Sequence, residues 1–390
     1  MNQKYEKLFE PFTFPSGVTV KNRILMAPMT TWSAFDNGMV TKDELAYYEK
    51  RAGDVGAIIT ACAYVSSEGK AFPGGFSGNS DAMIPSLTKV AKTIKNKGSK
   101  AILQIFHGGR MVPPEAIGGK TPISASAIPA MRKEAVTPRE MTDEEIKNVI
   151  NQFGETTRRA IEAGFDGVEI HGANTYLIQQ FFSPHSNRRT DNWGGTLEKR
   201  MSFPVAVVQS VLQNVKNHAE KPFLVGYRIS PEEIEEPGIT FEETLQLLDK
   251  LTKERLDYIH VSLGTIWRGS VRNKNATRPL LELIQQHIGH KIPLIGVGSI
   301  SHPDDAVEAL DKNIPLVALG RELIVEPEWI QKVKSGDVEA ICQSMSLEDQ
   351  EHLVIPDAMW EMTTSVPGWL PINENQNAHN RNEPWVKSTI

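Results

Sequence analysis

The chain has 390 residues, of which 40% are hydrophobic and 23% charged, a composition typical of a globular protein with a large core. Its net charge of −6 and isoelectric point near 6.0 argue against a basic surface for nucleic acid. No run of residues approaches the roughly 18 apolar positions of a membrane span, and residues 1–10 contain no signal-peptide core. The two cysteines, Cys62 and Cys342, form neither a CxxC pair nor a disulfide framework, so we expect a reducing, cytoplasmic setting.

Short apolar runs alternate with longer amphipathic segments along the chain. The runs predict strands that are buried on both faces, at 23–29, 56–61, 100–106, 165–171, 223–229, 258–262, 293–297 and 316–320. The amphipathic segments predict helices at 41–52, 85–97, 142–163, 196–217, 240–253, 276–287 and 302–311. Eight strands with helices between most of them predict the α/β class and a single-domain (β/α)8 TIM barrel; a doubly wound open sheet is the alternative.

Two segments fall outside this alternation of strands and helices. Residues 107–141 are too many for a simple turn after the third strand and carry several Pro and Gly, so we expect a lid or cap. The barrel is then expected to occupy residues 1–345. Residues 346–390 show little periodicity and are expected to form a C-terminal extension that packs on the surface or onto another subunit; a homo-oligomer stays open.

An imidazole, an amide and a phenol follow the fourth predicted strand, at His171, Asn174 and Tyr176. If the chain turns helical there, His171 and Asn174 face the same way, because residues three apart share a helix face. Two donors aimed at one point can hold a carbonyl oxygen, and a nearby phenol can supply a proton. The cluster therefore indicates a site for a small-molecule substrate at the barrel mouth, where barrel enzymes place their chemistry.

Glycine turns follow the last two predicted strands, at Gly298-Ser299 and Gly320-Arg321. Loops after strands seven and eight often bind phosphate in this fold. A glycine lets the backbone approach an anion, and a guanidinium can donate two hydrogen bonds to phosphate oxygens. Structural turns alone would also explain the first glycine pair, but the arginine after the second favours a phosphate site.

Several short strings, in this order on a barrel, resemble the old yellow enzymes, which are FMN-dependent ene-reductases of the NADH:flavin oxidoreductase group. The resemblance covers the chain from about Leu8 to Trp329. Its strings are Lys21-Asn22-Arg23, Ala27-Pro28-Met29-Thr30, Gln104 with His107-Gly108-Gly109-Arg110, Pro138-Arg139-Glu140-Met141-Thr142, Phe165-Asp166-Gly167-Val168-Glu169-Ile170-His171, Asn192-Trp193-Gly194-Gly195 with Arg200, and Gly320-Arg321-Glu322-Leu323.

The resemblance implies FMN, held without a covalent bond at the barrel mouth, and NADH or NADPH as the co-substrate. The residues implied to line or hydrogen-bond the flavin ring are Ala27, Pro28, Met29, Thr30, Ala61, Gln104 and Arg228. Those implied to bind the phosphate are Gly298, Ser299, Gly320 and Arg321. His171 and Asn174 would bind the carbonyl oxygen of the substrate, Tyr176 would be the proton donor, and Trp32 would line the pocket.

The implied reaction is hydride transfer from flavin N5 to the activated C=C bond of an α,β-unsaturated carbonyl compound; quinones and nitro compounds are further candidate acceptors. The bacterial branch of the family often has cysteine where Thr30 stands and tyrosine where Trp32 stands, so the resemblance leaves the redox potential and the pocket wall unspecified. Longer members add a cysteine-rich iron–sulfur region and an FAD domain. The sequence has neither, so we expect no electron relay of the dienoyl-CoA-reductase type.

Each site residue also has a structural interpretation. Thr30 could bond to backbone, Gln104 could be a satisfied buried amide, Arg228 could pair with a carboxylate such as Glu169, and His171 or Tyr176 could belong to the core. The alternative functions are an FMN-binding protein with little turnover and a metal-dependent barrel hydrolase, for which His107 and His171 are the candidate ligands. We expect no metal. His107 and the loop residues His185, Arg188 and Arg189 are interpreted as structural.

Overall fold

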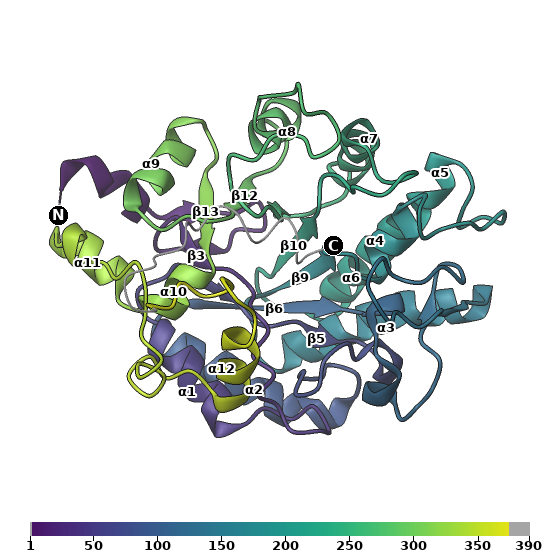
Figure 1. Ribbon diagram of the computed structural model, residues 1–390, viewed down its shortest axis with the longest axis horizontal. Helices are drawn as coiled ribbons and strands as arrows, with labels where there is room; N and C mark the ends of the chain where they lie inside the picture. Colours follow the sequence, from purple (N-terminus) through teal and green to yellow (C-terminus); the bar gives the residue numbers. More distant parts are fainter. Residues whose placement is uncertain (1, 374–390) are drawn as a thin grey trace.

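A closed barrel of eight parallel strands lies at the centre of the computed structural model, which describes residues 2–373 (Figure 1). The order around the barrel follows the sequence, and pairing of β4 with β6 and of β13 with β3 closes it. The strands are β3 (Ile24–Met26), β4 (Ala57–Ile59), β6 (Lys100–Phe106), β9 (Gly167–Gly172), β10 (Leu224–Ile229), β11 (Tyr258–Val261), β12 (Leu294–Val297) and β13 (Leu316–Leu319). All eight predicted strands are confirmed, and the open-sheet alternative is wrong.

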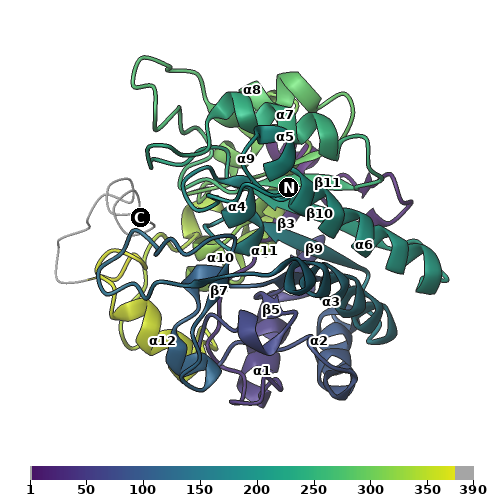
Figure 2. The ribbon, with the colours of Figure 1, turned by 90° about the vertical axis from the view of Figure 1, so that its right-hand side faces the viewer.

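Helices surround the barrel, as the predicted alternation requires (Figures 1 and 2). The predicted ones are found as α1 (Lys42–Arg51), α2 (Ile84–Asn96), α3 (Asp143–Glu162), α5 (Leu197–Arg200), α6 (Ser202–His218), α7 (Phe241–Leu251), α8 (Leu280–Ile288) and α9 (Pro303–Asp311). Thr142 and Thr240 start α3 and α7 with capping boxes, which satisfy backbone donors at each first turn. The predicted helix 196–217 is two helices that meet at Met201, and the predicted helix 276–287 starts late because Pro279 is its N-cap.

The far, N-terminal end of the barrel is filled with apolar side chains. Strands β1 (Phe12–Thr13) and β2 (Thr19–Val20) form an antiparallel hairpin. Its residues Phe14, Val18 and Val20 pack in one buried cluster with strand residues of the barrel interior, which include Leu25, Ile102, Leu224, Ile295 and Leu316. The opposite side of each strand packs in the larger core against the helices. The interior is therefore apolar at the end that the hairpin covers.

The segment predicted to be a cap, residues 107–141, follows β6, and its Arg110 amide and Ser124 hydroxyl both donate to Gln180 Oε1. It contains the short strands β7 (Ile123–Ser124) and β8 (Arg139–Glu140), which pair in parallel. Buried Arg189 donates to the carbonyls of Ala125 and Met141 and pairs with Asp191 at 2.6 Å. Arg189 thus holds both ends of the paired segment, in line with its structural interpretation.

The described part of the C-terminal extension packs against the barrel. Helices α10 (Arg321–Val325), α11 (Trp329–Ser335) and α12 (Asp357–Thr364), which the pattern did not predict, lead into and form part of this region. Fully buried Arg51 of α1 donates to the carbonyls of Leu323 and Leu353 and so links α1 to both segments. A boundary near residue 345 stays a prediction, and residues 374–390 lie outside the described part. No helix within residues 2–373 is long and apolar enough to cross a membrane.

Candidate active site

Polar side chains replace the apolar interior near the C-terminal end of the barrel strands. Glu169 is in register with Gln104 and Gly226, and the next layer along aligns His171, Arg228 and His260. Residues in register share a face of the sheet, and residues two apart along a strand share it too. These side chains therefore form two polar layers inside the barrel. Gln104 donates through Nε2 to Glu169 at 2.7 Å, and His260 Nδ1 lies 2.9 Å from the same carboxylate.

Arg228 is a buried cation whose hydrogen bonds are not completed within the described protein. Its side chain is 8% exposed, and its Nε has no hydrogen-bond partner. Burial lowers the pKa of Arg228, while Glu169 raises it, but no ion pair joins Arg228 to a described carboxylate. The alternative of a direct pair with Glu169 is therefore not what the structure shows. A buried guanidinium without an acceptor is costly, so this position fits an electron-rich edge of a bound flavin.

The predicted ring-binding residues lie at the ends of β3 and β4. Ala27 and Pro28 are buried, and Met29 and Thr30 are half-buried in the loop after β3. A Cβ on Gly320, after β13, would lie 3.2 Å from Met29 Sδ and 3.7 Å from the Cβ of Ala27, so this position keeps the two strand ends close. Buried Ala61 lies shortly after the neighbouring strand β4, and its amide donates to the Tyr48 hydroxyl at 2.8 Å.

The predicted phosphate-binding residues are brought together by direct contacts. The Nη2 of Arg321 donates to Ser299 Oγ at 3.0 Å, and Ser299 Oγ donates to the carbonyl of Gly264 at 2.9 Å. Gly298 has φ +136°, and a Cβ there would lie 2.7 Å from the carbonyl oxygen of Leu263, so glycine is required. Gly320 forms the junction between β13 and α10: it is the N-cap of α10, and Arg321 is the first residue of that helix.

His171 presents a neutral imidazole with its proton on Nε2. Its ring is buried, and its Nδ1 accepts from the amide of Ala173 at 3.3 Å. Burial, with the nearby charge of Arg228, holds the pKa of His171 well below its usual 6.5. Since the neutral ring accepts at Nδ1, Nε2 is the hydrogen-bond donor.

Asn174 lies in a left-handed turn and not in a helix. The chain therefore does not turn helical after His171, as the predicted alignment of His171 with Asn174 required. Asn174 and Thr175 have φ of 55° and 65°. The Asn174 Oδ1 accepts from Ser262 Oγ at 2.9 Å, and its backbone amide donates to Ser230 Oγ at 2.9 Å. Because the amide oxygen is engaged, the exposed Asn174 keeps its Nδ2 as a donor. Serines at the ends of β10 and β11 thus orient it.

The left-handed backbone at Thr175 is held by two glutamines of α4 (Leu177–Phe182). The Thr175 amide donates to Gln179 Oε1 at 3.0 Å, and its carbonyl accepts from Gln180 Nε2 at 2.6 Å. A β-branched residue at positive φ is strained, so such contacts are needed to keep it there. Gln179 is held in turn by buried Glu233, whose Oε1 accepts from it at 2.7 Å.

Tyr176 lies among aromatic rings. Its ring centroid is 4.8 Å from His171, with the planes at 89°, and 5.1 Å from Phe106. The ring centroid of Phe72 lies 6.2 Å from that of Tyr176 and 6.2 Å from that of Trp32, so the half-buried Trp32 belongs to the same group of aromatic rings. Burial raises the pKa of Tyr176 well above 10, so the phenol keeps its proton at neutral pH.

Sequence reasoning missed several residues of this region. Phe72, Phe106 and Cys62 share a buried cluster with Tyr176, and Glu169 and His260 complete the polar layers. Glu169 could have been found from the sequence, because it is a charged residue within the apolar run Gly167–Ile170. Burial raises the pKa of Cys62 to about 12, so its thiol stays protonated at neutral pH and is not an activated nucleophile.

His107 has the structural role that was predicted for it. It is buried, its Nδ1 accepts from the Gly109 amide at 3.0 Å, and burial lowers its pKa to about 3. Within residues 2–373, no group of three or more His, Cys, Asp or Glu could hold a metal ion. The described residues therefore give no support to a metal-dependent hydrolase.

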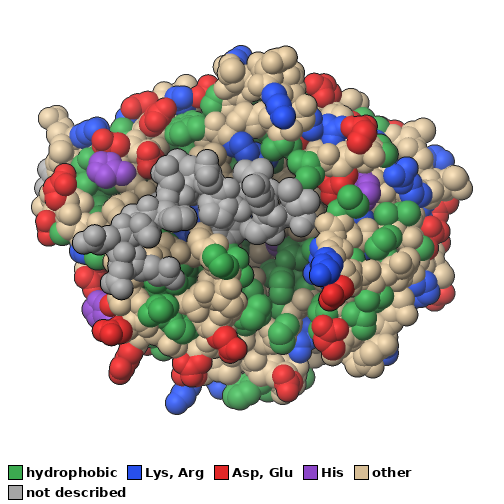
Figure 3. Space-filling view, viewed as in Figure 1, with side chains coloured by type: hydrophobic (Ala, Val, Ile, Leu, Met, Phe, Trp, Pro, Cys, Tyr) green, Lys and Arg blue, Asp and Glu red, His purple; other side chains and the backbone are tan. Residues whose placement is uncertain are grey.

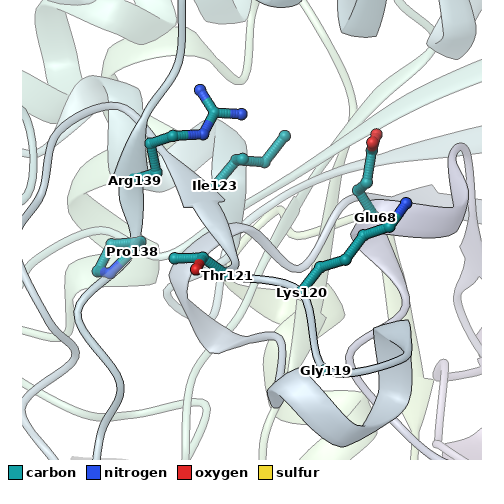
Figure 4. A pocket seen from close by; sticks show the side chains of 7 residues that line it. All are labelled: Glu68, Gly119, Lys120, Thr121, Ile123, Pro138 and Arg139. Carbon is teal, nitrogen blue, oxygen red and sulfur yellow. The ribbon is translucent and has the colours of Figure 1, made fainter.

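A surface pocket formed largely by residues 119–139 differs from the predicted site. This pocket of about 740 Å³ is lined by Glu68, Gly119, Lys120, Thr121, Ile123, Pro138 and Arg139 (Figure 4). None of these residues belongs to the predicted site, so the pocket and the predicted site share no lining residue. On the face seen in Figure 3, hydrophobic side chains gather near the middle and charged ones lie mostly around the rim.

Comparisons with known proteins agree with this geometry. The family model described as the NADH:flavin oxidoreductase / NADH oxidase family matches residues 7–339. The probable NADH-dependent flavin oxidoreductase YqiG of Bacillus subtilis (strain 168) is 46% identical over 374 residues, which are 96% of this chain and 100% of that protein. The NADH:acrylate oxidoreductase of Vibrio harveyi is 49% identical over 359 residues, which are 91% of this chain but 36% of that protein.

A solved structure carries the same fold. The old yellow enzyme homologue from Zymomonas mobilis superposes with a TM-score of 0.74 at 26% identity, covering 85% of this chain and 93% of that one. The family model matches most of the chain, and the similarity to YqiG extends over the full length of that protein. Together these two matches show the family and the cofactor. The chain belongs to the NADH:flavin oxidoreductase family of old yellow enzymes and is an oxidoreductase that uses FMN with NADH or NADPH.

Proposed function

We propose that the protein reduces the activated C=C bond of α,β-unsaturated carbonyl compounds. The observation that supports this most is the packing of the His171 and Tyr176 rings, 4.8 Å apart, at the end of β9, with Asn174 in the turn between them. Hydrogen bonds to His171 Nδ1 and Asn174 Oδ1 leave the Nε2 of His171 and the Nδ2 of Asn174 as donors. FMN, when bound, supplies the redox chemistry, accepting a hydride from NADH or NADPH and passing one to the β-carbon of the alkene.

His171 and Asn174 would bind the carbonyl oxygen of the substrate. His171 Nδ1 already accepts a hydrogen bond, so the free donor of this residue is Nε2. Asn174 Oδ1 likewise accepts a hydrogen bond, so its Nδ2 is the donor that points to the substrate in this proposal. As negative charge gathers on the oxygen, both hydrogen bonds strengthen, and one such donor is worth about 3 kcal/mol in enzymes where it has been removed. Both donors are also neutral, so they can bind an uncharged enone without an accompanying change in charge.

Tyr176 would protonate the α-carbon. Its raised pKa means that the acid is fully protonated under working conditions, and the ring contacts with His171 and Phe106 limit the directions that the hydroxyl can take. A group that starts protonated suits a general acid rather than a resting base.

The cofactor would be held by the residues that the sequence assigned. Arg228 and Gln104 would meet the pyrimidine edge of the ring, which supplies the acceptor that the buried Arg228 lacks among the described side chains. Ala27, Pro28, Met29, Thr30 and Ala61 would line the ring, and Gly298, Ser299, Gly320 and Arg321 would bind the phosphate.

The substrate pocket would favour compounds with an apolar body and one oxygen to be held. Its wall includes Trp32, Phe72 and Cys62. The acrylate oxidoreductase is similar to this chain over about a third of its own length, so acrylate is a candidate acceptor to be tested here. Quinones and nitro compounds remain further candidates.

The decisive experiment separates the two half-reactions. The purified protein with bound FMN is reduced anaerobically with NADH or NADPH, and reoxidation is followed after mixing with cyclohexenone, acrylate or menadione. We expect fast reoxidation by cyclohexenone with formation of cyclohexanone. Reoxidation by menadione without product from either alkene would contradict the proposal and favour a flavoprotein with little ene-reductase turnover.

A further inference from the structure

A fully buried carboxylate lies beneath the cation that faces the cofactor. Glu169 has no exposed surface and sits one layer below Arg228, because Glu169 pairs in register with Gly226 and Arg228 is two residues further along β10. At the usual strand rise, one layer is about 6.6 Å. Because this carboxylate has no exposed surface, its charge is screened much less than that of a surface residue.

Two neutral donors hold the Glu169 carboxylate in one orientation. Gln104 Nε2 donates to Oε1 at 2.7 Å, and His260 Nδ1 lies 2.9 Å from Oε2. His260 is also fully buried, and burial lowers its pKa although Glu169 opposes this, so the imidazole is neutral and donates from Nδ1. The side chains come from β6, β9 and β11, so three strands fix this carboxylate.

Glu169 is ionised despite its burial. Burial alone would raise its pKa, but His260, the charge of Arg228 and the hydrogen bond from Gln104 outweigh it, and the net pKa is lowered. The influence is mutual, since Glu169 is the strongest of the groups that raise the pKa of Arg228. The interior therefore carries one positive and one negative charge in adjacent layers.

The packing beneath Arg228 leaves space for this arrangement. Gly226 lies beside Tyr258 in the register, and a Cβ on Gly226 would be 2.0 Å from the Tyr258 ring. The glycine thus lets the phenol ring lie across the interior next to Glu169. Among its electrostatic neighbours, Glu169 contributes most, after burial, to the raised pKa of Tyr258, so this phenol is neutral and does not offset the carboxylate.

We propose that Glu169, oriented by Gln104 and His260, offsets the charge of Arg228 and so lowers the reduction potential of bound FMN. Reduction adds negative charge to the cofactor, and an uncompensated guanidinium beside it would favour the reduced form more strongly. Glu169 acts here as a positioning residue that touches neither cofactor nor substrate. The inference rests on the proposed place of Arg228 at the flavin edge.

The test is a spectroscopic redox titration of the FMN-bound protein and its Glu169→Gln variant. Glutamine has the same shape, and His260 can change tautomer to accept from it, so the variant should fold and keep its FMN. We expect the equilibrium constant for two-electron reduction to rise about tenfold, which is a positive shift of about 30 mV. Glu169→Asp, which withdraws the charge from Arg228, should shift the potential in the same direction by less, and decides the matter if the glutamine variant does not fold.

Two controls separate the possible failures. Asp257→Asn removes another buried carboxylate, which accepts from the amides of Ser16 and Val225 at the opposite end of the barrel, and should leave the potential unchanged. Arg228→Lys tests the underlying assignment. If it moves the potential while the folded Glu169 variants do not, the inference about Glu169 is wrong. If neither position affects the potential, the proposed place of Arg228 also fails.

Discussion

The imidazole of His171 and the phenol of Tyr176 stand at right angles, with ring centroids 4.8 Å apart. His171 lies near the end of β9 and Tyr176 is the N-cap of α4, so the proposed carbonyl-binding donor and the proposed acid are five positions apart in the chain. Both are uncharged at neutral pH, His171 because its pKa is lowered and Tyr176 because its pKa is raised. In the proposed reaction, the pair would bind an uncharged substrate and still deliver a proton.

Replacing Tyr176 with phenylalanine should impair one half-reaction and spare the other. Reduction of FMN by NADH or NADPH needs no acid from the protein and should keep its rate. Reoxidation by cyclohexenone should slow by about 10²- to 10⁴-fold, the usual contribution of a positioned general acid. Stopped-flow absorbance measures both rates. Tyr64→Phe, which removes a hydroxyl from the same buried cluster, is the matched control; equal slowing in both variants would mean that Tyr176 is not the acid.

Replacing Asn174 with alanine should weaken the binding of a phenol inhibitor about tenfold, since one neutral hydrogen bond is lost. FMN should stay bound, because the proposed contact is with the substrate oxygen. Flavin absorbance during titration with p-hydroxybenzaldehyde reports the dissociation constant. Asn275→Ala, on the exposed loop after β11, is the control. An unchanged dissociation constant in Asn174→Ala would remove this residue from the substrate site.

The buried Glu44 should make stability fall as pH rises. Burial raises its pKa from 4.5 to about 7, although the hydrogen bond from Thr31 opposes this. Between these values the folded state binds a proton that the unfolded state has lost, so the free energy of unfolding decreases with pH, by about 3 kcal/mol in total. Below pH 4.5 Glu44 does not lower the free energy of unfolding, and above about pH 7 the decrease has reached its full size.

Glu44→Gln should remove this pH dependence. Relative to the native protein, the variant should gain stability between pH 5 and about pH 7 and show a constant difference above that, as measured by urea unfolding of the FMN-bound forms. Glu308→Gln, a substitution at an exposed pair with Lys312, should show no such trend. A constant difference between Glu44→Gln and the native protein at all pH values would show that Glu44 ionises normally.

Arg321→Ala should weaken the binding of FMN but not of riboflavin. The guanidinium contacts Ser299 at the turn that is proposed to hold the phosphate, and a charged hydrogen bond contributes about 1.5–3 kcal/mol. FMN affinity should fall about 10- to 100-fold, while riboflavin, which lacks the phosphate, should bind both proteins equally. Fluorescence titration of the flavin-free protein measures both ligands, with the exposed Arg278→Ala as control. An equal loss for riboflavin would point to a general folding defect.

The sequence predicted what depends on local pattern and on barrel topology. Apolar runs buried on both faces gave the strands, and parallel strands in a closed barrel must bring their ends together, which is why Gln104, His171 and Arg228 could be assigned to one mouth. Ser299 and Arg321 were grouped for the same reason, and the structure joins them by a hydrogen bond.

What could not be predicted depends on contacts between distant residues. The left-handed backbone at Thr175 is held by Gln179 and Gln180, whose side-chain directions are set by tertiary packing. The contact of Glu169 with His260 joins residues 91 positions apart and requires the strand register. The short helix α4 has no side-chain cap, so no start signal marked it in the sequence.

The hairpin β1–β2 has a consequence for the kinetics of the proposed reaction. Phe14, Val18 and Val20 fill the N-terminal end of the barrel, so with FMN at the C-terminal end, as proposed, nicotinamide and oxidant would reach the flavin from the same side and exclude each other. Double-reciprocal plots of initial rate should therefore be parallel, and excess of either reactant should inhibit competitively against the other.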